Sequence, residues 1–170
     1  FGYRGRHAAR IEAALDSAAE LTLKMQSVTG EIPFGGRSNQ FLHNESMLAS
    51  YCELEAVRYA RRGDGQTAGA FKAAAALAAD RLMDYLQLKP IRHVKNRYDI
   101  RTRIGCEEYG YFNKYMITVA SNIYMGYMFA DDRIAPAVAP AQAGGYLIRT
   151  GEAFHKTFLN AGGYFLELDT

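Results

Sequence analysis

Polar side chains that could act as general acids, general bases or anion ligands gather in three stretches of this 170-residue chain. The first stretch, residues 30–45, contains two adjacent glycines followed by charged and amide side chains, and it ends at Glu45. Glu45 lies at helical spacing from apolar positions 48, 49, 52 and 56, so its carboxylate is expected where an apolar helix face meets the helix end. Such a carboxylate has a raised pKa unless it is paired, which suits a general acid. The other candidates in this stretch are Arg37, Asn39, Gln40, His43 and Asn44.

The first stretch also has a purely structural interpretation. An ion pair between Glu45 and Arg37 would stabilise the start of the helix, with Asn39 as the helix cap. The sequence leaves both interpretations open.

The second stretch, residues 89–103, is strongly basic. Its six lysines and arginines are set against one acid, Asp99, which gives a local charge of +5. A surface with that charge attracts anionic ligands, and arginine can hold a carboxylate through two parallel hydrogen bonds. The alternative is a solvated loop whose charges offset acidic neighbours. The donors available to an anion here are Arg92, His93, Asn96 and Arg97.

The third stretch, residues 106–115, brings acids, phenols and an amine to the expected start of a helix. Carboxylates at such a position also complement the helix dipole, and aromatic side chains at helical spacing commonly belong to the core. Tyr115, Tyr124 and Tyr127 are expected in that core. The candidates for ligand contact or catalysis are Glu107, Glu108, Tyr109, Tyr111 and Lys114.

No metal or cofactor is expected. The sequence lacks a paired-histidine metal motif, a phosphate-binding glycine loop and a nucleophile elbow. Its two cysteines, Cys52 and Cys106, are 54 residues apart and match no zinc or redox spacing.

Four helices are expected to position these residues. Apolar residues recur at helical spacing in each, Gly63 ends the second helix and Asp64 caps the third. The fourth carries apolar side chains on every face, which predicts that it is enclosed on nearly all sides. The expected helices span about residues 7–27, 41–62, 65–88 and 109–130.

The C-terminal part of the chain is expected to form β structure. Residues 146–150 and 164–168 have the pattern of strands, and residues 160–163 have the composition of a hairpin turn. We therefore expect a mainly α fold of antiparallel helical hairpins over residues 1–140. A short antiparallel β segment, the start of a β domain, follows over residues 141–170.

The lengths of the connections place the polar stretches together. The second and third helices are joined by residues 63–65 alone, so they must be antiparallel neighbours. The other two connections, residues 28–40 and 89–108, are long and polar. If the helices alternate in direction, both long connections fall at the same end of the helices, where long loops on a rigid scaffold commonly have a function.

The composition excludes several classes of protein. With 49% hydrophobic residues and 20 basic against 18 acidic residues, the chain is ordinary globular sequence. Its longest apolar run, residues 115–130, is shorter than the roughly 20 residues that a bilayer requires, so no membrane partner is expected. Nucleic acid is also not expected, because the near-neutral chain has no binding motif and only Tyr98 offers a stacking ring in the basic stretch.

Three segments carry a resemblance to a known class of proteins. They are Gly-Gly-Arg-Ser-Asn-Gln-Phe-Leu-His-Asn-Glu, Ile-Arg-His-Val-Lys-Asn-Arg-Tyr and Gly-Gly-Tyr-Phe-Leu-Glu-Leu-Asp. Together with the helical hairpins, they resemble bacterial carbohydrate-active proteins of the α/α-toroid type, over about residues 30–170. Heparinase-like polysaccharide lyases and uronate-processing glycoside hydrolases belong to this class. Four helices make only part of a toroid, so the resemblance implies a piece of a longer chain, located in the periplasm or secreted.

The resemblance implies cleavage of glycosidic bonds in an acidic, uronate-containing glycan, with hydrolysis by paired carboxylates as the leading reaction. In a hydrolase, Glu45 would act as the acid with Glu107 or Glu108 as its partner, and His43 or His93 would assist proton movement. Substrate binding would fall to the polar side chains of the same end: Arg37, Asn39, Gln40, Asn44, Arg92, Asn96, Arg97, Tyr98, Tyr109, Tyr111 and Lys114.

Two alternatives stay open. In a polysaccharide lyase, Arg97, Asn44 or Asn96 would neutralise the uronate carboxylate while a tyrosine or histidine removes the C5 proton. In the other alternative, the chain is a non-catalytic glycan-binding or structural helical domain whose acids form surface ion pairs.

Overall fold

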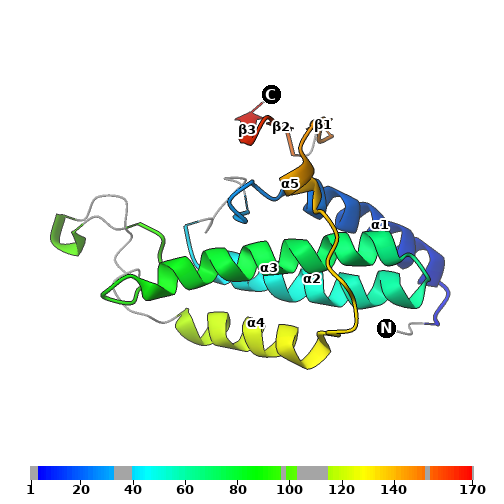
Figure 1. The fold of residues 1–170 in the computed structure, drawn as a ribbon, viewed down its shortest axis with the longest axis horizontal. Coiled ribbons are helices and arrows are strands. Elements are labelled where there is room, and N and C mark those ends of the chain that lie inside the picture. Colours follow the sequence, from blue (N-terminus) through cyan, green and yellow to red (C-terminus); the bar gives the residue numbers. More distant parts are fainter. Residues whose placement is uncertain (1–3, 33–39, 97–98, 103–114, 152–153, 170) are drawn as a thin grey trace.

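The chain folds into helices followed by a small sheet (Figure 1). The computed structural model describes residues 4–32, 40–96, 99–102, 115–151 and 154–169. The helices are α1 (Ala8–Met25), α2 (His43–Arg61), α3 (Gly65–Gln87), α4 (Met116–Phe129) and α5 (Pro140–Ala143), with a 3-10 turn at Ile100–Thr102. The strands β1 (Tyr146–Arg149), β2 (Lys156–Ala161) and β3 (Tyr164–Asp169) form one antiparallel sheet in that order. The expected mainly α fold with a short C-terminal antiparallel sheet is confirmed.

The α2–α3 hairpin is the centre of the molecule. The predicted stripe of α2 is buried along its length, from Glu45 through Cys52 to Ala56, and it packs on the alanine-rich face of α3. Small alanine side chains let the two helices approach closely. The hairpin turn follows the predicted signals, since Gly63 adopts a φ of +82° and the Asp64 carboxylate accepts a hydrogen bond of 3.0 Å from the Thr67 amide.

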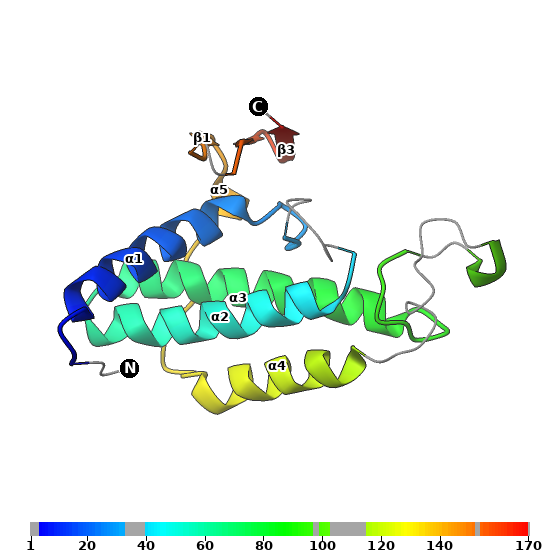
Figure 2. The ribbon, with the colours of Figure 1, turned by 180° about the vertical axis from the view of Figure 1, so that it is seen from behind.

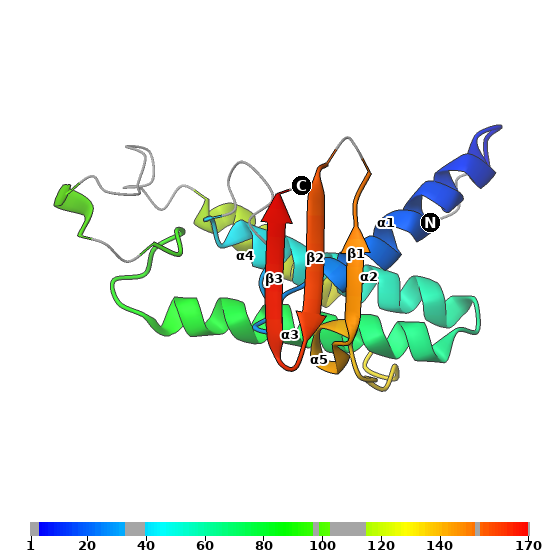
Figure 3. The same ribbon diagram turned by 90° about the horizontal axis from the view of Figure 1, so that it is seen from above.

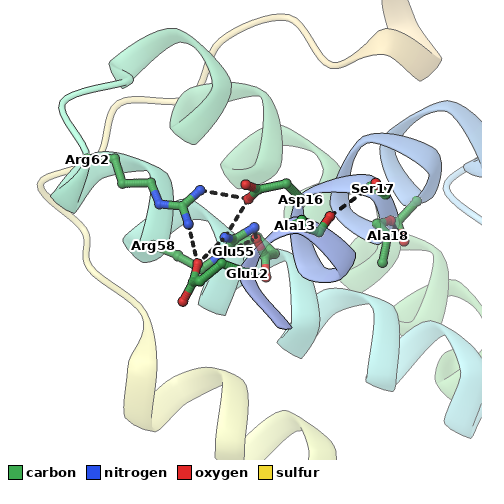
Figure 4. Close-up of polar contacts among 9 residues, drawn as sticks. Glu12, Ala13, Asp16, Ser17, Ala18, Glu55, Arg58 and Arg62 are labelled. Carbon is green, nitrogen blue, oxygen red and sulfur yellow. Dashed lines mark hydrogen bonds and ion pairs between the residues drawn. The ribbon is translucent and has the colours of Figure 1, made fainter. Parts of the chain in front are cut away.

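Helices α1 and α4 lie on opposite sides of this hairpin (Figures 1 and 2). An ion-pair network joins the start of α1 to the end of α2, so these two helices are antiparallel (Figure 4). In that network Arg58 lies 2.6 Å from both Glu55 and Asp16, and Arg62 pairs with Asp16 and Glu12.

Helix α4 runs in the same direction as α2. Asn122 donates hydrogen bonds to the Ser46 hydroxyl and the His43 carbonyl near the start of α2, and Gly126 lies against Ser50 one turn further on. A Cβ on Gly126 would lie 3.2 Å from Ser50 atoms, so the glycine allows the two helices to meet closely. The four helices therefore alternate in direction as expected.

The expectation that α4 is enclosed on nearly all sides is wrong. Only Val119 and Gly126 are buried, because α4 packs chiefly on α2 and turns its other faces outward. Tyr124 and Tyr127, expected in the core, are 62% and 78% exposed. Among the described helices, none is both long and apolar enough to span a bilayer.

The sheet stands on α5 and on the end of α1, and its strands run across the helices (Figure 3). The Tyr146 hydroxyl donates to the Lys24 carbonyl, and the Asn160 amide donates to the Ala141 carbonyl. The predicted hairpin turn is confirmed, with Gly162 and Gly163 both at positive φ as a tight two-residue turn requires.

Removal of Arg58 should destabilise the fold, because it leaves the 6%-exposed Glu55 carboxylate without its cation. We expect Arg58→Met to lower the free energy of unfolding by about 3 kcal/mol, measured by urea denaturation. The control is Arg61→Met, on the same helix at an exposed position, which should change it by less than about 0.5 kcal/mol. Equal losses in the two variants would show that the network contributes nothing specific.

Candidate functional site

The two long connections meet at the end of the helices where α2 begins and α3 finishes. Phe41 and Val94 form an antiparallel bridge between them. On either side of the bridge, the Leu42 amide donates to the His93 carbonyl at 2.8 Å and the Lys95 amide donates to the Gln40 carbonyl at 2.7 Å. The expectation that both connections fall at one end of the helices is therefore confirmed for their described residues.

Glu45 lies in the first turn of α2 and pairs with Lys95 across this junction. The Lys95 ammonium lies 2.5 Å from Glu45 Oε1, and the Glu45 side chain is fully buried while that of Lys95 is 12% exposed. Burial raises the pKa of Glu45, and the positive charge of Lys95 acts in the opposite direction. Within the described residues, Glu45 Oε2 has no hydrogen-bond partner. The carboxyl group of Glu45 therefore releases its proton less readily than that of an exposed glutamate.

This pairing differs from the structural alternative considered for Glu45. Among the described residues its partner is Lys95, and the cap position of α2 is Leu42, which makes no side-chain capping bond. Arg37 and Asn39 lie outside the described residues.

Two histidines and two aromatic rings form a cluster beside the Glu45–Lys95 pair. Phe41 stacks with the imidazole of His43 and with that of His93, with ring centroids 5.5 Å and 5.4 Å away. Tyr115, the residue before α4, lies within 5.5 Å of all three rings. The Asn122 hydrogen bonds fix α4 to the start of α2 and so bring Tyr115 beside His43.

The two histidines differ in access to solvent. His93 is fully buried, whereas His43 is only half-buried. Burial, reinforced by the charge of Lys95, lowers the pKa of His43, so its imidazole is neutral at pH 7. His43 Nδ1 is buried and has no hydrogen-bond partner among the described residues, so the exposed part of the residue lies elsewhere. His43 is thus a neutral imidazole that is partly exposed.

The remaining candidates divide into two groups. Four candidates are half-buried and lie within three positions of a bridge residue in the sequence, so they border the same junction: Gln40, Asn44, Arg92 and Asn96. The others lie outside the described residues, and the structure gives no position for them: Arg37, Asn39, Arg97, Tyr98, Glu107, Glu108, Tyr109, Tyr111 and Lys114.

A pocket of about 370 Å³ adjoins the junction on the side of the sheet. Lys95 lines it together with Glu31 from the first connection and Tyr164 from β3. Glu31 is itself held in place, since the Tyr85 hydroxyl donates to it at 2.8 Å and Arg81 lies 3.2 Å away. An exposed phenol ring beside charged and hydroxyl groups is a surface that can stack on and hydrogen-bond to a sugar.

Sequence reasoning missed two residues of this site. Lys95 counted only as one charge of the basic stretch, and Tyr115 was expected in the core, although its side chain is 36% exposed. The pairing of Phe41 with Val94 decides the position of Lys95, and the packing of α4 on α2 decides that of Tyr115. No local pattern in the sequence indicates either contact.

No group of histidine, cysteine or acidic side chains in the described part of the chain is arranged to hold a metal ion. Comparisons with protein-family models, with curated proteins and with solved structures found no match to this chain.

Removing one partner of the Glu45–Lys95 pair should destabilise the fold. Glu45→Gln leaves the Lys95 ammonium nearly buried without a counter-charge, and we expect a loss of about 3 kcal/mol in the free energy of unfolding. Adding Lys95→Met to this variant should recover much of that loss, because no isolated charge then remains.

The matched control is Glu20→Gln, which removes an ion pair with Lys24 whose glutamate is 70% exposed. It should cost less than about 1 kcal/mol in the same urea titration. If the double variant is less stable than Glu45→Gln alone, the account of the buried pair is wrong.

Proposed function

We propose that the junction of the two connections is the active site of a carbohydrate-active protein that cleaves an acidic, uronate-containing glycan by β-elimination. The observation that carries this proposal is the neutral, half-buried His43 imidazole beside the Tyr115 ring, at the end of the helices that bears the basic connection. The resemblance to toroid-type lyases supports the same substrate class.

The proposed base is His43 because a base must be unprotonated and within reach of the substrate. Of the candidate catalytic residues that the structure describes, Glu45 and His93 are fully buried, which leaves His43 as the accessible one. In this proposal Glu45 is a positioning residue, since it fixes Lys95 beside the histidine and the pocket.

In the proposed step, His43 takes the proton from C5 of the uronate. The electrons of that C–H bond form the C4–C5 double bond, and the bond from C4 to the glycosidic oxygen breaks. The leaving oxygen receives a proton, and the proposal assigns its donation to the hydroxyl of Tyr115, whose ring lies beside His43. Asn44, Arg92 and Asn96 would hold and neutralise the uronate carboxylate, with Arg97.

Hydrolysis is the second candidate, and the raised pKa of Glu45 favours it. Glu45 would then protonate the leaving oxygen, with Glu107 or Glu108 as the second carboxylate. This route requires Glu45 to leave its ion pair with Lys95 and reach the glycan, so we rank it below elimination. A non-catalytic glycan-binding role is the outcome if neither reaction occurs.

Incubation with uronate oligosaccharides separates these possibilities. Elimination gives an unsaturated uronate that absorbs in the near ultraviolet, whereas hydrolysis gives new reducing ends without that absorbance. We expect His43→Ala to lower the rate by at least about a hundredfold, as is typical for loss of a general base. His155→Ala, at an exposed histidine before β2, is the control and should leave the rate unchanged.

The pH dependence gives an independent check on the base. Because the pKa of His43 is lowered from its usual 6.5, the imidazole stays neutral to more acidic pH. The rate should therefore rise with pH through an inflection below 6.5 and then level. An inflection above that value, or full activity of His43→Ala, would remove His43 from the role of base.

A further inference from the structure

Helix α4 presents an unusually apolar outward face. Its fourteen residues, Met116–Phe129, include no charged side chain. A helix that is apolar on all faces is normally buried, and monomeric proteins rarely expose continuous apolar patches of this kind. The large side chains of this face are between 47% and 78% exposed: Ile117, Tyr124, Met125, Tyr127, Met128 and Phe129.

The outward residues follow the spacing of a helix-pairing seam. Ile117, Ser121, Tyr124 and Met128 are separated by four, three and four positions, which is the alternation of a coiled-coil contact line. A groove of about 200 Å³ lies along another side of α4, where Ile123 and Tyr127 meet small side chains of α2 and α3 and the charged Glu53. The seam therefore offers a ridge for a second helix, and the groove lies at its flank.

We infer that this face is the interface between two copies of the chain, with their α4 helices antiparallel about a two-fold axis. Six half-exposed large side chains, at about 100 Å² each, supply roughly 600 Å² per copy. A standard interface needs about 800 Å² per partner, which these side chains and the flanking groove together approach.

The helix dipoles favour the antiparallel arrangement. An antiparallel pair places the positive end of each α4 beside the negative end of the other, whereas a parallel pair places like ends together. The acids that follow α4 do not decide the orientation, because Asp131 pairs with Arg133 at 2.7 Å and Asp132 lies 3.7 Å from Lys72. A membrane is a poorer partner, because an interfacial helix carries basic residues on its polar face and α4 carries none.

The test is sedimentation equilibrium of the chain over a wide concentration series. We expect a dimer of 18.9 kDa protomers. Tyr124→Glu should raise the dissociation constant of this dimer by at least about thirtyfold, as for a central interface residue. Leu166→Glu, at a 52%-exposed leucine on the outer face of the sheet, is the control and should leave the dimer intact. A wild-type chain that stays monomeric, or a dimer that only Leu166→Glu dissociates, overturns the proposal.

The orientation has its own test. In an antiparallel pair with its axis near the middle of α4, Ile117 of one copy faces Met128 of the other. Ile117→Lys and Met128→Glu should each weaken the dimer, and the double variant should restore it by placing opposite charges together. If the double variant does not bind itself at least tenfold more tightly than either single variant does, the antiparallel arrangement is excluded. Circular dichroism of each variant shows whether the helices are retained.

Discussion

The bridge between Phe41 and Val94 is the interaction on which the candidate site depends. Two backbone hydrogen bonds hold connections that are more than fifty positions apart in the sequence, and the same register sets Lys95 over Glu45 and His93 beside Phe41. The bridge can be specific because the α2–α3 hairpin fixes where each connection leaves the helices. The positions of the site residues therefore depend on helix packing through these two backbone hydrogen bonds.

The helices and the hairpin turn could be predicted because their signals are local. Asp64 caps α3 by a bond to an amide three residues away, and the buried stripe of α2 follows from helical spacing alone. The short connection predicted that α2 and α3 are antiparallel, and the assumption that all four helices alternate in direction correctly placed the two long connections at the same end. Such features depend on residues that are close in the sequence.

The remaining features depend on pairing that the sequence does not encode locally. The partner of Glu45 is set by the register of two long connections, so a basic stretch of six charges did not single out Lys95. An apolar helix such as α4 is compatible with burial by its own chain or by another one, and composition does not distinguish them. For the site, the meeting of the connections was predictable, whereas the roles of the side chains remain proposals.

The difference between contacts that are local in the sequence and contacts that are distant affects the order in which parts of the protein fold and open. The α2–α3 hairpin joins neighbours in the sequence, so its loop-closure cost is small, and we expect it to form early. The junction at Phe41 requires a much larger loop to close and should form late. For the same reason it should be the first part to open in native-state hydrogen exchange, with the Leu42 and Lys95 amides exchanging before those inside the hairpin.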